Sequence, residues 1–536
     1  MKKRPNIVIF NPDEMRWDTM GHMGNPAAVT PNLDRMAGTD GVSFSHAFCQ
    51  NPVCVPSRCS FFTGLYPHVN GHRTMAHLLR PGETTLLKEL KESGYYVWMN
   101  DRNDLCAGQY PGWVESHADE IFYPDGKLRA PGSLDNSLGK KFFYSHYEGK
   151  LGLDENGRNY STDDQAVDAA VRCIQQHGGD EKPLCLFLGL QFPHTPYRVE
   201  DPYYSAIDRT KLPRRVRMEE CTGKSAMLKA IRSYNGMETA TDAEWDEIRA
   251  VYLGMCSKID AQFGRLCDAL KEAGIYDDTA IFFFSDHGDY TGDYGLVEKA
   301  QSSLEDCLTR VPLLVKPPKD YPLDAGVSGS LCELVDFYAT AMEMAGVRPS
   351  HSHFGRSLVP VLADRTAEIR QYSFCEGGRT ASEQHCDEYH GPNGEPGRPQ
   401  DIYWPKKMAQ ADNAAHAKAT MIRDRQYKYI SRTTGEDELY DLLADPHETT
   451  NRIDDPTLSE VKYRLQLALM RWLQETSDIV PFDFDNRFTE ESMWSKVAAI
   501  VPPEYEQEMR AMVRGGATMG AAFAFAASLA ARKKQG

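Results

Sequence analysis

Cys54 is the residue of this chain with the most specific chemical context. It lies in the segment NPVCVPSRCSFFTG, residues 51–64, with Pro56 two positions later and Arg58 four positions later. This spacing matches the signal read by enzymes that oxidise cysteine to formylglycine. The hydrated aldehyde is a geminal diol, so one oxygen can attack sulfur or phosphorus and the other can later expel the product. A cysteine without such a context is more often a small buried apolar residue.

Other groups that can bind a cation or an anion directly follow short apolar segments. They are Asp13 after Ile7–Phe10, His194 after Leu184–Leu190, and the pair Asp286 and His287 after Ala280–Phe284. Ligands of open α/β sheets bind beyond the carboxyl ends of the strands. An isolated Asp-His pair is usually part of a solvated loop, but its position after an apolar strand favours a binding role.

The elements that would position these groups alternate between strand and helix patterns. Buried parallel strands are predicted for Ile7–Phe10, Tyr95–Met99, Leu184–Leu190, Ala280–Phe284 and Val311–Val315. Helical patterns occur in Leu86–Glu92, Asp163–Gln176, Ala243–Ala273 and Leu331–Ala345. This alternation predicts an α/β fold in which helices sandwich a large, mostly parallel sheet.

The Cys54 motif, its continuation Thr63-Gly64-Leu65-Tyr66-Pro67-His68 and the later segment Asp286-His287-Gly288-Asp289 resemble the sulfatase family of the alkaline-phosphatase superfamily. The resemblance spans roughly residues 5–455. It implies hydrolysis of a sulfate ester with S–O cleavage. It also implies a formylglycine made from Cys54 by a separate maturation enzyme, and one divalent cation.

The pattern changes after about residue 375. Gly391–Trp404 is rich in glycine and proline and is expected to be a loop. Met421–Ile430 indicates a strand entering a hairpin, and Leu458–Glu475 has helical spacing. By resemblance, we expect a catalytic α/β domain over residues 1–375 and a C-terminal α+β subdomain with a small antiparallel sheet over residues 376–480. A helical extension would cover residues 481–536.

The resemblance implies that Asp13, Asp286, His287 and the modified Cys54 ligate the cation. Glu14 departs from the Asp or amide that many relatives carry at its position, and we include it as a further candidate ligand. Ca²⁺ prefers oxygen ligands, and the family most often uses it, so it is expected first. The histidine leaves Mn²⁺ or another transition ion as an alternative.

The same resemblance assigns catalytic roles to Arg58, His194 and Lys299. Arg58 would pair with the formylglycine oxygen or with the metal-binding carboxylates. His194 lies in Phe192–Tyr197, where flanking prolines fix the loop direction, and it would contact the sulfate and act as a base. Lys299 would bind a sulfate oxygen, although a lone lysine is usually a solvated surface charge.

The segment around Arg102 departs from the family pattern Gly-Lys-x-His. Here Arg102 takes the lysine position and Asp104 takes the histidine position. Arginine can still hold an anion through two hydrogen bonds. Asp104 would instead bind a sugar hydroxyl or orient Arg102. His72 follows the nucleophile motif closely and is a further candidate for substrate binding.

A sulfated sugar, glycan fragment or small organic sulfate is therefore the expected substrate. One alternative is a phosphonate monoester or phosphodiester hydrolase on the same scaffold, because those relatives share the formylglycine and the Asp-His pair. Another is a non-catalytic anion-binding homologue, in which Cys54 stays a thiol. A thiol enzyme is disfavoured because no histidine is paired with Cys54 locally.

Composition limits the possible classes and partners. The chain has 536 residues, of which 41% are hydrophobic and 26% charged, and this indicates a large globular domain with a smaller one. The net charge of −17 disfavours nucleic acid, although a local cationic site can still bind an anionic substrate.

Cysteine usage and apolar segments indicate the compartment. The 13 cysteines are odd in number and irregular in spacing, which fits a reducing compartment. The first apolar run is too short for a secretory signal, so we expect a cytoplasmic protein. No segment is long and apolar enough for a membrane span. Gly515–Ala531 is expected to be a helix packed on the body or on another subunit, which leaves a homo-oligomer open.

Overall fold

The computed structural model describes residues 4–390, 398–482 and 487–535. The chain divides into two compact units. The large unit runs through Pro349 and again from His353 to Asp478, and the small unit contains Ser350–Ser352 and the chain from Ile479 onwards. All candidate site residues belong to the large unit.

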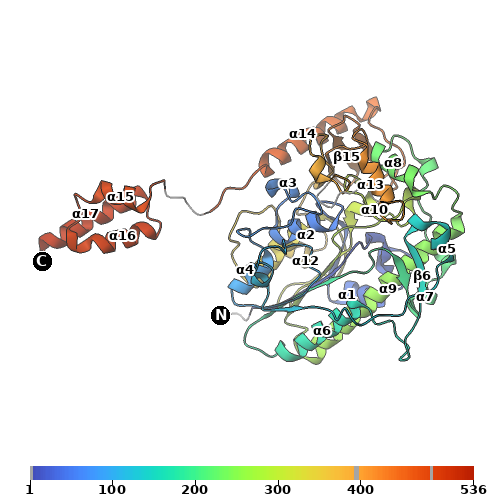
Figure 1. Cartoon of the computed structure of the whole chain (residues 1–536), viewed down its shortest axis with the longest axis horizontal. Coiled ribbons are helices and arrows are strands. Elements are labelled where there is room, and N and C mark those ends of the chain that lie inside the picture. Colours follow the sequence, from blue (N-terminus) through green and yellow to red (C-terminus); the bar gives the residue numbers. More distant parts are fainter. Residues whose placement is uncertain (1–3, 391–397, 483–486, 536) are drawn as a thin grey trace. The chain divides into compact units, whose positions relative to one another are not determined.

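The described part of the large unit is built on a nine-stranded, mostly parallel sheet (Figure 1). Its strand order is β10-β2-β11-β9-β1-β7-β3-β4, and β12 pairs with β2. The strands are β1 (Asn6–Pro12), β2 (Val42–Phe48), β3 (Tyr96–Asn100), β4 (Glu120–Phe122), β7 (Leu184–Leu190), β9 (Thr279–Phe284), β10 (Arg310–Val311), β11 (Leu313–Lys316) and β12 (Gly326–Glu333). Because β1 is parallel to both β7 and β9, the three carboxyl ends meet at one edge of the sheet.

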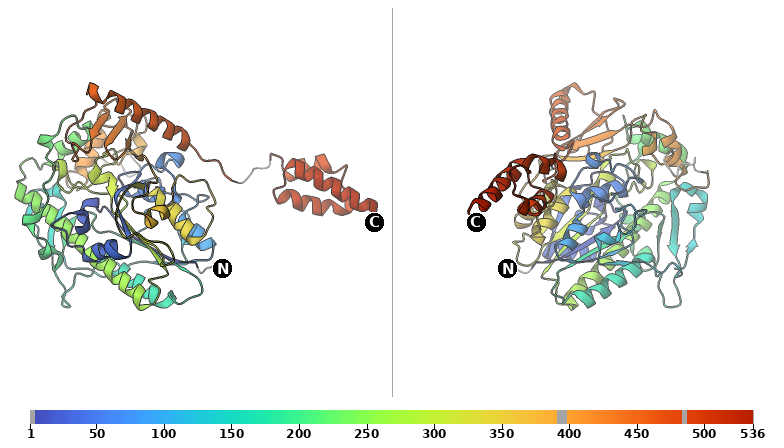
Figure 2. Two further views of the ribbon diagram at one scale, coloured as in Figure 1. Left: turned by 180° about the vertical axis from the view of Figure 1, so that it is seen from behind. Right: turned by 60° about the vertical axis from the view of Figure 1, so that its left-hand side comes forward.

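Helices cover both faces of this sheet, as the views in Figures 1 and 2 show. One face carries α1 (Pro31–Thr39), α6 (Thr162–His177) and α9 (Asp242–Glu272), and the other carries α2 (Cys54–Thr63), α4 (Leu86–Glu92) and α11 (Val335–Ala345). Successive side chains of a strand point to opposite faces. Val8 and Phe10 of β1 therefore pack in the core beneath α1, α6 and α9, while Ile7 and Ile9 pack in the core beneath α2, α4 and α11. The predicted α/β sandwich is confirmed.

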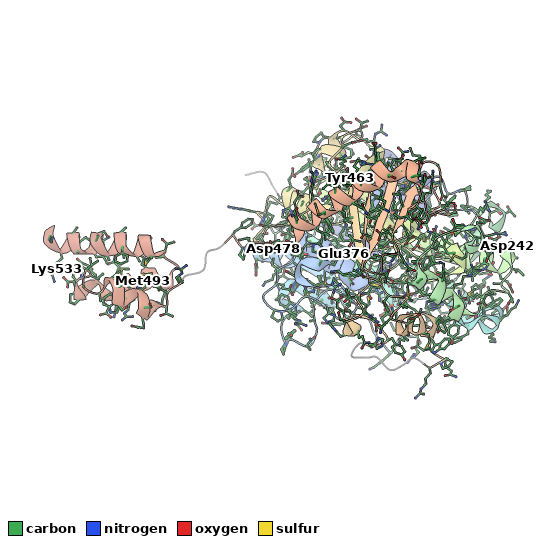
Figure 3. The ribbon with its side chains drawn as sticks, turned by 90° about the horizontal axis from the view of Figure 1, so that it is seen from above. Asp242, Glu376, Tyr463, Asp478, Met493 and Lys533 are labelled. Atoms are coloured by element: carbon green, nitrogen blue, oxygen red, sulfur yellow. The ribbon has the colours of Figure 1, made fainter. Side chains whose placement is uncertain are left out.

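A smaller antiparallel sheet follows in the same unit, in the order β13-β14-β15-β16. Its strands are β13 (Ser373–Gly377), β14 (Ala419–Arg423), β15 (Tyr427–Arg432) and β16 (Glu438–Asp441). The helix α14 (Ser459–Thr476) packs on it through Leu465, Leu469 and Trp472, and Tyr463 lies on the exposed side of α14 (Figure 3). The predicted hairpin and helix are confirmed. Residues 391–397 of the predicted loop lie outside the described residues.

Shorter elements connect these parts. A further sheet has the order β5-β6-β8. The strands and short helices are β5 (Ser133–Asp135), β6 (Tyr147–Leu151), β8 (Tyr197–Val199), α3 (Pro67–Asn70), α5 (Ser137–Lys141), α7 (Tyr203–Ala206), α8 (Ala226–Asn235), α10 (Asp306–Thr309), α12 (Val359–Ala363) and α13 (Trp404–Ala411).

Two predicted elements were wrong in detail. The expected parallel strand Val311–Val315 is split into β10 and β11, which pair antiparallel with β2, and β11 also pairs antiparallel with β9. Pro312 separates them because proline has no N–H to donate to a strand ladder. The expected helix Leu331–Ala345 begins only at Val335, because Leu331–Glu333 belong to β12. A continuous apolar run fits both a buried strand and a buried helix.

The small unit contains three helices in its described residues, α15 (Glu490–Val497), α16 (Glu506–Arg514) and α17 (Met519–Gln535). They pack on one another around a core that includes Met493, Val497, Met509 and Ala522. Gly515–Ala531 was expected to be one helix, but residues 515–518 connect α16 to α17, and the helix begins only at Met519. None of the helices in the described chain combines the length and apolar character that a bilayer span requires.

Candidate active site

The ends of β1 and β9 are held together by Ser285. Its hydroxyl accepts a hydrogen bond from the backbone N of Met15 at 2.7 Å and donates to the carbonyl O of His287 at 2.8 Å. The backbone N of Glu14 also donates to Oδ1 of Asp286 at 3.2 Å. Asp13 and Asp286 therefore lie side by side, and both are fully buried.

The start of α2 lies directly against these two carboxylates. Cys54 is the first residue of the helix, and Pro56 fits its first turn because N–H groups there have no partner within the helix. Arg58 lies one turn later on the same face. Its Nε donates to Asp286 Oδ2 at 2.9 Å and its Nη2 to Asp13 Oδ2 at 3.1 Å. The Cys-to-Arg spacing of the motif thus places both side chains at the same strand ends.

Asp13, Cys54, Asp286 and His287 form a buried cluster whose ligand atoms all lie within 4.8 Å of one another. Sγ of Cys54 is 3.3 Å from Nε2 of His287 and 3.5 Å from Oδ1 of Asp13. Arg58 binds the Oδ2 atoms of Asp13 and Asp286, so the Oδ1 atoms of both carboxylates face the cluster. This donor set fits a single metal ion.

His287 has the protonation state that a ligand needs. Its Nδ1 lies 2.8 Å from the carbonyl O of Gly288 and donates to it, so the lone pair is on Nε2. Burial lowers the pKa of His287, which keeps the ring neutral. Gly288 is needed for this turn, because a Cβ there would lie 2.0 Å from the carbonyl O of Cys307.

The unmodified thiol of Cys54 is poorly suited to nucleophilic attack. Burial, reinforced by the charge of Asp13, raises its pKa well above the ordinary value, and the thiolate is the reactive form. The histidine that contacts Cys54 is His287, from a distant part of the chain, as expected if both residues bind the same cation.

A cationic group adjoins the cluster. Nζ of Lys299 lies 2.8 Å from Nε2 of His194, 3.1 Å from Oε2 of Glu14 and 3.1 Å from Oε1 of Glu298. Burial alone would lower the pKa of Lys299, but its acidic neighbours raise it well above the usual value. Lys299 therefore remains charged although it is buried.

His194 is neutral at the same place. Its Nδ1 is 2.8 Å from the carbonyl O of Thr195 and donates to it, so Nε2 accepts the hydrogen bond from Lys299. Burial, reinforced by the charge of Lys299, lowers the pKa of His194 to about 3.

This neutral histidine predicts a pH dependence of stability. Between the unfolded value of 6.5 and the folded value of about 3, the folded chain binds fewer protons than the unfolded chain. The free energy of unfolding should therefore fall as the pH is lowered through this window. The substitution His194→Gln is expected to reduce the slope by about one proton, measured by denaturant unfolding at several pH values between about 4.5 and 7.

His177→Gln is the matched control, because His177 lies at the surface end of α6 and pairs with Asp180. It shows how much of any change in slope follows from replacing a histidine at the surface. A His194 variant with the parental slope would show that His194 is not held neutral in the folded chain.

Arg102 completes the cationic side. Its Nη2 contacts Oδ2 of Asp13 and lies 3.9 Å from Oδ2 of Asp104. Gly189 of β7 makes room for this segment, since a Cβ there would lie 2.4 Å from the carbonyl O of Arg102. Asp104 is more exposed than the residues of the cluster, at 36% of its side chain.

The structure does not bring all candidates together. His72 contacts the carbonyl O of His77 at 2.9 Å and Oε1 of Glu83 at 2.7 Å, and neither residue belongs to the cluster. Its predicted role in substrate binding stays a prediction. Glu14 reaches Lys299 and His194 through Oε2, and it groups with Asp13 and His194 apart from His287. Its Oε1 has no hydrogen-bond partner among the described residues.

Sequence reasoning gave no role to four buried residues that surround Lys299 and Glu14: Tyr197, Asp289, Glu298 and Lys406. The hydroxyl of Tyr197 donates to Asp289 at 2.7 Å, and burial raises the pKa of Asp289 to about 6. Tyr197 and Asp289 lie within the quoted motifs and could have been noticed there. Lys406 comes from a distant segment without any motif.

Backbone strain gathers at this site. Glu14, Asp104, Thr291 and Glu298 all have positive φ, at 72°, 45°, 44° and 66°. Non-glycine residues rarely adopt this region, and a β-branched threonine is a pronounced exception. Such residues cluster where the fold must fix a side chain in a functional direction.

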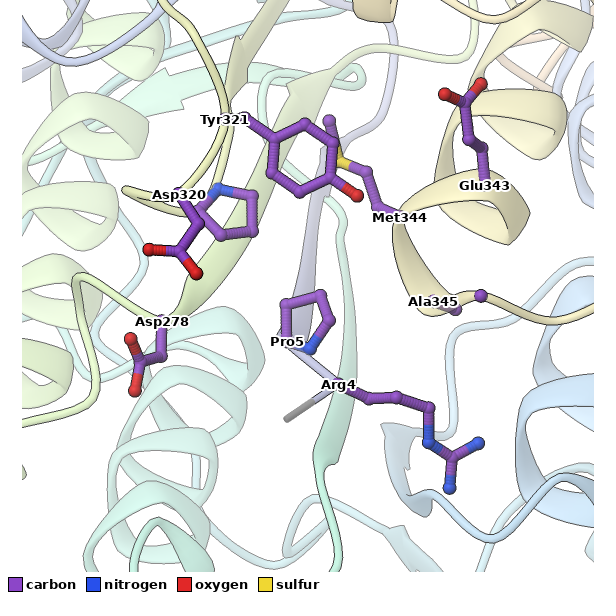
Figure 4. Close-up of a pocket in the computed structure, with 10 residues that line it drawn as sticks. Arg4, Pro5, Asp278, Asp320, Tyr321, Glu343, Met344 and Ala345 are labelled. Carbon is purple, nitrogen blue, oxygen red and sulfur yellow. The ribbon is translucent and has the colours of Figure 1, made fainter. Parts of the chain in front are cut away.

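A separate cavity of about 270 Å³ lies near the start of β1 (Figure 4). It is lined by Arg4, Pro5, Tyr321 and Met344, among others. Asp13 follows the opposite end of β1, so this cavity is distinct from the buried cluster.

Comparisons with known proteins agree with the geometry. The sulfatase family model matches residues 5–347. The chain is 25% identical over 545 aligned positions to the multifunctional alkaline phosphatase superfamily protein PehA of Trinickia caryophylli, covering 89% of this chain and 96% of that protein. It is 26% identical over 476 aligned positions to arylsulfatase K of Gallus gallus, covering 84% of this chain and 79% of that protein.

Solved structures share the fold. The phosphonate monoester hydrolase of Agrobacterium radiobacter superposes with a TM-score of 0.65 at 22% identity, covering 88% of this chain and 96% of that one. The structure of BT4656 in complex with its substrate D-glucosamine-2-N,6-O-disulfate superposes with a TM-score of 0.66 at 20% identity. The match covers 88% of this chain and 98% of that chain.

Proposed function

This chain belongs to the sulfatase family, and from that premise we propose that it hydrolyses a sulfate ester carried by a sugar or glycan fragment. The observation that carries the proposal is the convergence of a buried ligand cluster with Arg102, His194 and Lys299 at the ends of β1, β7 and β9. A cation site beside fixed positive charge suits an anionic ester.

In this proposal a maturation enzyme oxidises Cys54 to formylglycine, whose hydrate supplies the nucleophilic oxygen. Asp13, Asp286 and His287 would hold one divalent cation, which when bound supplies Lewis acidity and orients the reacting groups. Ca²⁺ is the first candidate because carboxylate oxygens dominate the donor set, and Mn²⁺ is the alternative because of the imidazole.

The side chains of this chain then have separate tasks. Arg58 fixes the two carboxylates so that their Oδ1 atoms converge. Lys299 and Arg102 bring positive charge to the oxygens of the bound anionic ester. The ring of His194 is neutral, and its unprotonated Nε2 can accept a proton. Asp104 lies beside Arg102 with its side chain partly exposed, and it can accept a hydrogen bond from a sugar hydroxyl.

A substrate panel tests the proposal. Protein with formylglycine verified by peptide mass spectrometry and with measured metal content would be offered sulfated monosaccharides and disaccharides, an aryl sulfate and an aryl phosphodiester. Release of inorganic sulfate from a sulfated sugar at the highest kcat/KM is the expected result. Matured, metal-loaded protein that released no sulfate from any member would refute it.

The second candidate is a phosphonate monoester or phosphodiester hydrolase. It is favoured by the similarity in fold to the Agrobacterium radiobacter enzyme. The same panel separates the two, because this candidate requires the aryl phosphodiester to be the best substrate. A protein in which Cys54 stays a thiol in its native host would instead favour the non-catalytic anion-binding homologue.

Arg102→Ala is expected to raise KM for the best anionic ester by about 10- to 100-fold, the effect of losing a hydrogen bond to a charged group. The effect on kcat should be smaller if Arg102 mainly binds the ground-state anion. Steady-state kinetics measure both. Because Arg102 also contacts Asp13, metal content must be measured in the same samples.

Arg214→Ala is the control, since the Arg214 side chain is 75% exposed and pairs with Glu220. It should leave KM unchanged. An Arg102 variant that loses kcat but keeps the parental KM would contradict a role in binding the substrate anion.

A further inference from the structure

A buried pair of charges lies behind Lys299. Nζ of Lys406, in the first turn of α13, is 3.1 Å and 3.3 Å from the two carboxylate oxygens of Glu298. It is also 3.2 Å from Oε2 of Glu388. Lys406 is 8% exposed and Glu298 is 4% exposed. This ion pair is therefore shielded from solvent, and its electrostatic attraction is screened less than that of a surface pair.

Glu298 connects the two lysines. Its Oε1 is 3.1 Å from Nζ of Lys299, and its Oε2 accepts a hydrogen bond from the backbone N of Lys299 at 2.9 Å. Its backbone is held in the left-handed region at φ 66°. Its N–H donates to the hydroxyl of Tyr197 at 3.2 Å, and its carbonyl O accepts from the backbone N of Tyr290 at 3.0 Å. Glu298 is thus fixed in place by the fold.

The ammonium group of Lys299 has three protons, and three protein groups lie within hydrogen-bonding distance of it. They are Nε2 of His194, Oε2 of Glu14 and Oε1 of Glu298. An ester oxygen can be bound only if one of these contacts is exchanged. How easily Lys299 leaves Glu298 depends on what else neutralises that carboxylate.

Lys406 is the second cation on Glu298. Burial would raise the pKa of Glu298, but Lys406 and then Lys299 lower it below the usual range, so the carboxylate is charged. Without Lys406, this buried carboxylate would hold Lys299 as its direct counter-ion, because an unpaired buried charge is very costly. Lys299 would then be less available to an incoming anion.

We propose that Lys406 is a positioning residue for substrate binding, which neutralises Glu298 so that Lys299 can offer its charge to an anionic ester oxygen. The inference rests on the proposed function, since it requires Lys299 to meet an anionic substrate. It adds a determinant that is more than a hundred residues away from the motif that contains Lys299.

The test compares Lys406→Met with the parent, using protein with verified formylglycine and metal content. KM for the best ester and the inhibition constant of inorganic sulfate are expected to rise together by about 10- to 100-fold, the usual effect of losing a supporting partner. The change in kcat should be smaller. Lys406→Arg keeps the charge and should restore most of the affinity.

A double-mutant cycle separates this role from a purely structural one. In the Glu298→Gln background the carboxylate charge is already gone, so adding Lys406→Met should change KM and sulfate affinity by less than about threefold. An undiminished loss in that background would overturn the proposal. If Lys406→Met alone does not fold, the pair of variants in the Glu298→Gln background still decides the question.

Lys407→Met is the matched control on the same helical turn. Lys407 pairs with Asp401 at 2.9 Å and its side chain is 20% exposed, so KM and sulfate affinity should not change. A parent that neither hydrolyses any ester nor binds inorganic sulfate would refute the proposed function and this inference with it. An active parent whose Lys406→Met variant keeps both values would refute the inference alone.

Discussion

Cys54→Ala is expected to lower kcat/KM for the best ester by about 10⁴-fold or more, because the side chain that becomes the nucleophile is removed. The substitution deletes one small buried group at the start of α2. The contacts of Arg58 with Asp13 and Asp286 do not involve that group. The fold and the remaining ligands should therefore persist, and the loss should appear mainly in kcat. Released sulfate or phosphate is the measurement.

Cys59→Ala provides the control from the same helix. Cys59 is also a buried free thiol, and its Sγ lies 3.9 Å from the carbonyl O of Leu105 instead of facing the cluster. The kcat/KM of the Cys59→Ala variant should stay within a few-fold of the parental value once any loss of stability is taken into account. An alanine variant at position 54 that hydrolysed sulfate and phosphate esters at the parental rate would leave the proposed chemistry without a nucleophile.

The sequence was informative about the site where local spacing and sheet topology act together. Asp13 and Asp286 follow β1 and β9, and parallel neighbours must bring their ends together. Cys54 and Arg58 are one helical turn apart, so their side chains lie on the same face of the helix and reach the same place in the fold. For these residues, position in the sequence already limits position in space.

The sequence was less informative where a partner comes from far along the chain. Lys406 reaches Glu298 from α13 across 108 positions of sequence, and no periodicity or motif marks such a contact. The contact of His287 with Cys54 spans 233 positions, and only the family resemblance, which placed both residues among the ligands of one cation, predicted it. The antiparallel pairing of β11 was also missed, because an apolar strand carries no mark of its direction. The cytoplasmic location and the homo-oligomer stay predictions.

His287→Ala is expected to weaken binding of the divalent cation by about 100-fold or more, since even an outer partner of a metal ligand is typically worth 10- to 100-fold. The substitution removes the neutral Nε2 but leaves Asp13 and Asp286 paired with Arg58. Activity should fall by about 10³-fold, in keeping with several kcal/mol of charge stabilisation at such a site. Metal content after dialysis and titration with Ca²⁺ or Mn²⁺ measure binding independently of turnover.

His72→Ala is an instructive comparison, because His72 contacts Glu83 and His77 and no ligand of the cluster. It should retain the metal, and any rise in its KM would support the predicted contact with substrate. Restoration of the His287 variant by excess Ca²⁺ would show that its defect is weakened binding of the cation. If that variant kept parental metal content and affinity, the cation would have to be held without the imidazole. The buried position of a neutral Nε2 3.3 Å from Sγ of Cys54 would then need another explanation.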